Sequence, residues 1–430
     1  MSSSKHMPVQ EILLSPDPPW AVVPRTGDRT RSDVLETFGL DPARPVIVVG
    51  HQPVFWHAGI LAKFIAADAL AESTGAQLVH LVLDGHLGSY NEIHWPVHGE
   101  DGSLRRATWT FRDGDDGLPM AAQPACMPCP LPVEQPRGLD AIHRELEAAA
   151  SSGDAAIQQS TALDRLMDPW VGQRTTITAS ALAASPIGME LAERMLSEPG
   201  RCRSTYNNAL REHPGIDVAA LGDGELPSWT MHEDGDIRTS LETDDRALRR
   251  FPKALFLTAM ARLGLADVFI HGTGGARYDG CMEHWLDAWI DAQPCPIAVA
   301  SATIVMDADT VLQYESLRQE MISSARRRKH DPSLRSGTGP STGKTTLLAE
   351  MDSHPPKSPQ RREAYRRMHE TLGEMSGSSD GLLLPEERDR LQESMLIASD
   401  RTWAFPLHDP LVLDTMAAGI RGRMSEAIPS

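Results

Sequence analysis

One stretch near the N-terminus, residues 46–63, constrains the fold more than any other part of this 430-residue chain. It begins with four β-branched residues, Val46–Val49, which predict a short strand buried on both faces. After a turn, apolar residues recur every three or four positions from 58 to 72, which predicts a helix. A second apolar run, 78–83, predicts another strand. Strand, helix and strand in this order form a βαβ unit, whose two strands must be parallel.

Polar side chains follow both predicted strands, at the point where each strand ends. His51 and Gln52 come after the first strand, and Asp84 and His86 come after the second. In a parallel sheet, ligands bind beyond the carboxyl ends of the strands. We therefore expect these four side chains around one cleft.

The predicted helix begins beside this cleft. Backbone N–H groups at a helix N-terminus favour anions, and a histidine beside them can bind phosphate and stabilise a transition state. We expect His51 and His57 to act there as catalytic residues. The alternative is that His51 caps a turn and His57 is a packed aromatic ring. The binding residues expected around them are Gly50, Gln52, Gly59 and Lys63.

The second half of the chain repeats this order of elements around a glycine-rich loop, residues 271–279. A helix over 254–265 and a strand over 268–270 precede the loop, and a helix over 281–291 and a strand over 296–306 follow it. The glycines let the backbone approach a ligand closely, although they do not form a dinucleotide fingerprint. A tight turn with positive φ is the alternative role. The binding residues expected in the loop are His271, Gly272, Gly274, Gly275, Arg277 and Tyr278.

Six of the sixteen histidines lie between residues 51 and 98. This density leaves a divalent metal site open as an alternative, although no motif such as H-E-x-x-H occurs. For Asp84 we favour a hydrogen bond to a ribose or an amine. Asn91 and Glu92 are expected to bind ligand beside it.

Two further motifs are weaker. The pair Cys126 and Cys129 has the spacing of half a zinc knuckle, but a second pair is missing. The run 337–345 contains Gly-Lys-Thr, but its glycine spacing fails and no apolar strand precedes it, so it predicts a linker before a helix.

The composition of the chain makes some classes of binding partner and some cell compartments unfavourable. The net charge of −18 argues against a nucleic-acid or anionic-membrane partner. No apolar run reaches membrane-spanning length, no signal peptide is expected, and five scattered cysteines suit a reducing compartment. We therefore expect a cytoplasmic protein with a small-molecule substrate.

The expected fold class is α/β, a Rossmann-like parallel sheet core with an inserted mixed subdomain and a C-terminal α-helical hairpin. An edge strand is expected within 402–413. The sheet core is expected in two parts, 1–98 with an N-terminal wrap and 251–310, separated by the insertion 99–250. The hairpin or coiled coil is expected over 311–380 and begins with a helix over 311–328. The last division, 381–430, is expected to pack back on the core.

Three short segments of the chain resemble segments of one known family. Gly50-His51-Gln52-Pro53, the strand 78–84 with its polar loop, and the run 268–278 are similar to segments of the bacillithiol-biosynthesis cysteine-adding enzymes (putative cysteine ligases). They are more similar still to an uncharacterised bacterial group related to those enzymes. The opening His-Gln-Pro also resembles the WbqC-like family. The first resemblance implies a Rossmann-like core, connecting insertions and a coiled coil that forms a homodimer.

From these residues and this resemblance we expect a ligase or transferase that uses a nucleotide, such as ATP or ADP with Mg²⁺. It would join an amino acid, with cysteine as a candidate, to a small amine or sugar-amine acceptor. In this hypothesis His51, Gln52 and His57 hold phosphate, the loop 271–278 holds nucleotide or acceptor, and Asp84 with His86 orients the nucleophilic amine. A metal-dependent hydrolase and a non-catalytic binding or scaffold protein are the alternatives.

Overall fold

The computed structural model divides the chain into two compact units. The first holds Met1–Trp95, Ala107–Met306 and Arg401–Ser430, and the second holds Pro96–Arg106 and Asp307–Asp400. The structure describes residues 11–25, 27–88, 90–100, 103–114, 117–231, 237–241, 249–306, 342–374 and 385–425, with the single residues 316, 319 and 323.

A six-stranded, mostly parallel sheet forms the centre of the first unit, so the mixed α/β prediction is confirmed. β1 is antiparallel and extends the edge beside β11. The expected βαβ unit is present, because β2 and β3 pair in parallel and α2 (Ala58–Thr74) joins them. The strand order is β1 (Glu11–Ser15), β11 (Ile297–Thr303), β10 (Val268–His271), β2 (Val46–His51), β3 (Gln77–Val82), β6 (Thr175–Thr178).

Side chains alternate along β2 between two hydrophobic cores, one on each face of the sheet. Val48 belongs to the core that contains Trp285, which we call the α9-side core. Val49 belongs to the core that contains Phe64, which we call the α2-side core. Burial on both faces explains why β2 is a continuous apolar run rather than an alternating one.

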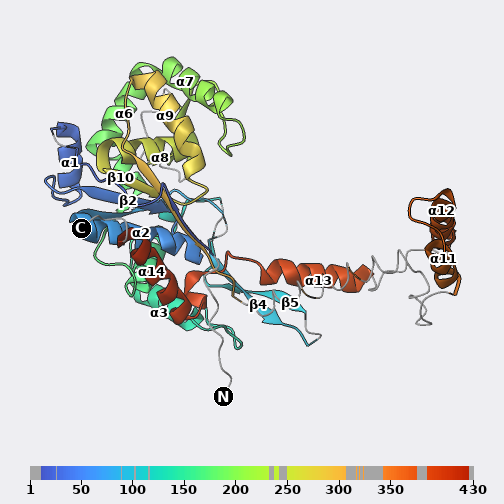
Figure 1. Ribbon diagram of the computed structural model, residues 1–430. Coiled ribbons are helices and arrows are strands. Elements are labelled where there is room, and N and C mark those ends of the chain that lie inside the picture. Colours follow the sequence, from blue (N-terminus) through green and yellow to red (C-terminus); the bar gives the residue numbers. More distant parts are fainter. Residues whose placement is uncertain are drawn as a thin grey trace. The chain divides into compact units, whose positions relative to one another are not determined.

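Helices cover both faces of this sheet (Figure 1). On the α9 side lie α1 (Arg29–Thr37), α5 (Ala179–Ala183), α6 (Pro186–Ser197), α7 (Pro199–Glu212), α8 (Ala254–Met260), which continues as a π-helical turn over Ala261–Leu265, and α9 (Ala276–Ile290). On the α2 side lie α2, α4 (Ala155–Met167) and α14 (Pro410–Ser425).

The remaining elements are shorter, and two of them, β4 (Glu92–His98) and β5 (Leu104–Thr110), contain residues of both units. They are a two-stranded sheet of β4 and β5, the turn Met120–Ala122, α3 (Leu139–Ala148), and an antiparallel sheet of β7 (Glu225–Met231), β8 (Ile237–Leu241) and β9 (Arg249–Pro252). Most of the expected insertion, 99–250, therefore belongs to the same compact unit as the sheet.

The edge strand expected within 402–413 is wrong. Phe405–Leu407 is a 3₁₀ turn, α14 begins at Pro410, and Ala404 forms an isolated bridge with His57. Pro406 and Pro410 explain the difference, because proline cannot donate a ladder hydrogen bond but is favourable at a helix start.

The second unit contains α11 (Thr342–Asp352), α12 (Pro359–Glu374) and α13 (Pro385–Ala398). α11 and α12 pack together, and Arg361 on α12 donates a 2.8 Å hydrogen bond to the carbonyl of Met351. The helix expected over 311–328 lies almost entirely outside the described residues, as does most of 337–345. In the described parts of both units, no helix combines the length and apolar character needed to cross a membrane.

Candidate functional site

A pocket of about 520 Å³ lies in the first unit, lined from the carboxyl ends of the adjacent strands β2 and β10. We call it the β2–β10 pocket. The end of β2, the first turns of α2, the glycine loop after β10, and Ser301 on β11 all contribute to its lining. Further lining residues come from elsewhere in the chain and include Asp217, Thr258 and Arg401.

The residues predicted after β2 and those predicted in the glycine loop meet in this pocket, whereas those predicted after β3 do not line it. The predicted residues among its lining are Gly50, His51, Gln52, His57, Lys63, His271, Gly272, Gly274, Gly275 and Tyr278. The predicted residues outside its described lining are Gly59, Asp84, His86, Asn91, Glu92 and Arg277.

Asp84 has a structural role instead of facing the pocket. Its buried carboxylate accepts hydrogen bonds from the backbone N–H of Ser180, at 3.0 Å, and from the Ser180 hydroxyl. These bonds join the end of β3 to the first turn of α5. The strand-end position was therefore predicted correctly, but the carboxylate turns toward a helix start.

The other predicted residues outside the pocket lining are buried in the fold, bonded to the backbone, exposed to solvent or needed for packing. Burial lowers the pKa of His86, and Asn91 donates a 3.2 Å hydrogen bond to the carbonyl of Arg112. Glu92 and Arg277 are exposed. Gly59 is needed for packing, because a Cβ there would lie 2.7 Å from the Ala302 carbonyl oxygen.

The turn between β2 and α2 is held rigidly by its own residues. His57 is the N-cap of α2, and its Nδ1 accepts a 3.0 Å hydrogen bond from the N–H of Gly59. The Trp56 indole donates a 2.7 Å hydrogen bond to the Gln52 carbonyl and stacks on Phe64, with ring centroids 4.9 Å apart. Fixed in this way, the turn presents His51 and Gln52 in one geometry.

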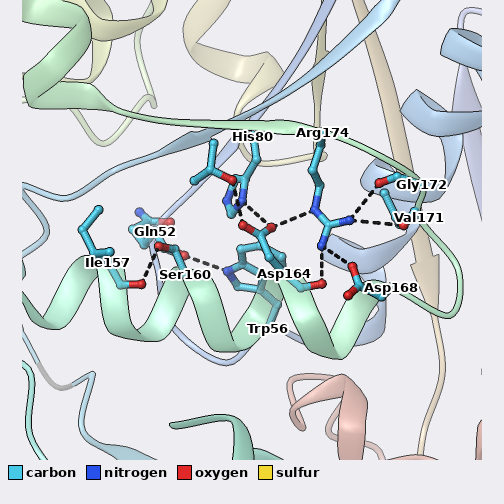
Figure 2. Close-up of polar contacts among 11 residues, drawn as sticks. Gln52, Trp56, His80, Ile157, Ser160, Asp164, Asp168, Val171, Gly172 and Arg174 are labelled. Atoms are coloured by element: carbon cyan, nitrogen blue, oxygen red, sulfur yellow. Dashed lines mark hydrogen bonds and ion pairs between the residues drawn. The ribbon is translucent and has the colours of Figure 1, made fainter. Parts of the chain in front are cut away.

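A partly buried polar network lies next to this turn (Figure 2). His80 on β3 places its Nδ1 3.0 Å from Asp164 on α4, and its ring meets the edge of Trp56. Arg174 donates a 2.8 Å hydrogen bond to the same carboxylate. Burial raises the pKa of Asp164, but the contacts with His80 and Arg174 outweigh it and lower that pKa to about 2. The network therefore holds an ionised carboxylate behind the pocket, whose described lining does not include it.

Lys63 is the most unusual residue of the pocket lining. Its side chain is 3% exposed, and its Nζ donates a 2.9 Å hydrogen bond to the Gly50 carbonyl. Burial lowers the pKa of Lys63 to about 7. Burial, and then the nearby Lys63 charge, hold the pKa of His51 well below its usual range. At neutral pH the pocket therefore contains a neutral imidazole beside an amine that readily loses its proton.

In the glycine loop, lack of space requires glycine at Gly275, and no left-handed turn requires it at any of the three glycines. Gly272, Gly274 and Gly275 are not among the positive-φ residues, so the alternative of a positive-φ turn is wrong. A Cβ on Gly275 would lie 2.4 Å from His271 Nδ1. Within the described residues, the backbone N–H groups of Thr273, Gly274 and Gly275 have no acceptor. These three successive free donors lie at the start of α9, and unpaired N–H groups at a helix N-terminus are suited to an anion.

Sequence reasoning missed the partner of His271. His271 Nε2 lies 2.8 Å from Oδ2 of Asp279, close enough for an ion pair although not aligned as a hydrogen bond. Asp279 is buried on the first turn of α9, with Arg262 Nη1 3.4 Å from its other oxygen. The signal was a carboxylate on the first turn of the helix that follows a strand-end histidine. Such a carboxylate favours the tautomer with the proton on Nε2, which leaves Nδ1 as a base facing the glycine loop.

The charged groups of the pocket favour an anionic ligand. Its described lining contains the charged Arg401 and the partly charged Lys63, against one carboxylate, from the exposed residue Asp217. Arg401 also contacts Thr303 through a 3.3 Å hydrogen bond. A lining with this balance attracts phosphate or carboxylate groups.

Among the residues that the structure describes, no group of three or more His, Cys, Asp or Glu side chains is placed to hold a metal ion, and Cys126 and Cys129 are free thiols. A scan against protein-family models found no match for the chain, and a comparison with curated proteins found none.

Proposed function

We propose that the chain is an enzyme, a ligase or transferase that uses a nucleotide, and that the β2–β10 pocket is its active site. One observation carries this proposal. The free N–H groups of the glycine loop, His51 and Lys63 converge at the carboxyl ends of two adjacent parallel strands. Phosphate groups are bound by backbone N–H donors and by side chains that can donate hydrogen bonds, as His51 and Lys63 can.

The strand order supports a Rossmann-like core. From β2 the chain adds β3 and then β6 on one side, and later adds β10 and then β11 on the other. The order therefore reverses between β2 and β10, and ligands in open α/β sheets bind at this reversal. The β2–β10 pocket lies there.

A nucleotide fits the donors that the chain offers. Its phosphates would contact the N–H groups of residues 273–275, with Arg401 as a further cation. Mg²⁺ takes much of its coordination from phosphate oxygens and water, so one carboxylate such as Asp217 is a sufficient protein ligand. When bound, the nucleotide would supply the phosphoryl or nucleotidyl group that activates a carboxylate.

The remaining polar residues suit the joining of an amine to that activated carboxylate. An attacking amine must lose a proton, and His271, oriented by Asp279, can accept it. The neutral imidazole of His51 can hydrogen-bond to oxygens where negative charge develops. We propose an amino acid, with cysteine as the candidate that the family resemblance suggests, and a small amine or sugar-amine acceptor.

Nucleotide titration by calorimetry tests this function. Wild-type protein should bind ATP or ADP with Mg²⁺, and His51→Ala should weaken that affinity at least tenfold. His86→Ala is the matched control, because His86 also follows a parallel strand but is not part of the described pocket lining. Equal affinity in wild type and His51→Ala, or no nucleotide binding by wild type, would refute the assignment.

We also propose a homodimer formed through a helical hairpin of α11 and α12. Leu348 on α11 and Tyr365 on α12 are 38% and 52% exposed, which leaves apolar surface on both helices. Light scattering during gel filtration should give twice the chain mass for wild type and the chain mass for Leu348→Glu with Tyr365→Glu. A monomeric wild type would contradict this proposal.

A further inference from the structure

Lys63 is placed where a charged amine is unfavourable. It belongs to the buried side of α2, which contains one other charged residue, Asp68. Asp68 has an ion pair with Arg421. In the described residues no carboxylate lies within ion-pair distance of Lys63, whose hydrogen-bond partner is the neutral carbonyl of Gly50. A buried ammonium without a counter-ion tends to lose its proton, in agreement with its pKa of about 7.

Lys63 nevertheless forms part of the pocket wall. Lys63 is part of the lining of the β2–β10 pocket, together with the titratable or charged groups His51, His57, His271, Asp217 and Arg401. A Cβ at Gly272 would lie 3.5 Å from Cδ of Lys63, so the glycine loop passes over the lysine stem without a side chain between them. A ligand in the pocket can therefore meet an uncharged primary amine.

We propose that Lys63 is a nucleophile that condenses with the carbonyl group of a small phosphate-bearing aldehyde or ketone and forms an imine. The lone pair of Nζ attacks the carbonyl carbon, and the carbonyl oxygen takes up a proton to give a carbinolamine. The oxygen then leaves as water, and nitrogen, having lost both of its hydrogens, forms the C=N bond. His51 and His271 are the described neighbours in the lining that can transfer these protons.

The phosphate requirement follows from the loop. The N–H groups of Thr273, Gly274 and Gly275 are free to hold a phosphate, and Gly272 of the same loop adjoins the lysine stem. This activity is separate from nucleotide use, although both would place a phosphate on this loop.

Reductive trapping of the full-length wild-type protein tests the inference. The probe is pyridoxal 5′-phosphate at pH 7.5, followed by borohydride and peptide mass spectrometry. The chain has six lysines, so the label can be assigned to each of them. About half of a lysine population with a pKa near 7 is uncharged at neutral pH, against roughly one in 2,500 at the ordinary pKa. Lys63 should therefore be labelled at least tenfold faster than the exposed Lys357.

Three controls test the amine chemistry and the phosphate requirement separately. Lys253 is a partly buried lysine that has a carboxylate partner, Glu225, and it should stay unlabelled. With pyridoxal, which lacks the phosphate, the ratio of Lys63 labelling to Lys357 labelling should fall at least tenfold, and inorganic phosphate should protect Lys63. The same ratio for the two aldehydes would overturn the phosphate requirement.

Absence of label on Lys63, or faster labelling of Lys357, would overturn the amine chemistry. Lys63→Met should remove the label, but the wild-type peptide map decides the question even if that variant does not fold. None of these outcomes depends on nucleotide affinity, so this inference and the proposed ligase activity can fail separately.

Discussion

Replacing Lys63 by methionine should stabilise the first unit, and the size of the effect follows from the pKa. Burial lowers the pKa of Lys63 from 10.5 to about 7 in the folded protein. The unfolded chain therefore gains free energy by protonating this amine, which at pH 7 costs the folded state about 4 kcal/mol. Methionine keeps a similar length without the amine. Loss of the hydrogen bond to Gly50 reduces the gain by about 1 kcal/mol, which leaves about 3 kcal/mol.

The sign of the pH dependence distinguishes this cause from simple packing. Between pH 7 and about 10.5 the unfolded chain binds more protons at this site than the folded protein does. The penalty is complete below pH 7 and disappears as the pH rises through this window. At pH 9 it has fallen to about 2 kcal/mol, so the advantage of Lys63→Met over wild type should shrink by about 2 kcal/mol between pH 7 and pH 9.

Urea denaturation followed by tryptophan fluorescence measures this difference. All nine tryptophans belong to the first unit, which also contains Lys63, so the signal reports the relevant unfolding. Lys253→Met is the matched control, because Lys253 is a partly buried lysine that has a carboxylate partner, Glu225. A Lys63→Met protein that is less stable than wild type by the same amount at pH 7 and pH 9 would refute the reasoning.

Three further changes test the surroundings of the pocket. Asp279→Asn should cost about 1–3 kcal/mol, because it removes one of the two carboxylates paired with Arg262 and leaves Glu283 at 2.6 Å, and it should weaken nucleotide binding in calorimetry by freeing His271. Gly275→Ala should displace the His271 ring and cost about 1–3 kcal/mol in urea denaturation, with at least a tenfold loss of nucleotide affinity. Asp164→Asn should remove about 2 kcal/mol at pH 7. That difference should vanish as the pH falls from about 4 to 2, since the pKa of Asp164 is lowered and its stabilisation needs the ionised form.

The sequence was sufficient for the centre of the sheet but not for its edges. Val46–Val49 is apolar on both faces, so β2 could be recognised without knowing its neighbours. β6, with the sequence Thr-Thr-Ile-Thr, has a weak signal, because an edge strand is defined by the partner that it joins. β1 was expected only as part of an N-terminal wrap, although it pairs with β11 over five residues.

Within the site, position along a strand was predictable and direction was not. The strand-end rule identified His51, His271 and Asp84 correctly as residues that follow parallel strands. It could not reveal that Asp84 would accept hydrogen bonds from Ser180, or that the carboxylate near His271 would come from α9. Those choices depend on contacts between residues that are far apart or on different elements, which hydrophobic periodicity does not encode.

The topology explains why one strand end became a pocket and the next did not. After β2 the chain enters α2 on one face of the sheet, and after the adjacent β10 it enters α9 on the other. Two helices that leave in opposite directions cannot fill the space between their first turns, so a crevice remains there. The chain that follows β3 does not diverge in this way from the chain that follows β2. The hydrogen bonds between Asp84 and Ser180 close the carboxyl end of β3. Polar residues that bind ligand are therefore expected from the ends of β2 and β10, and a carboxylate after β3 serves the fold.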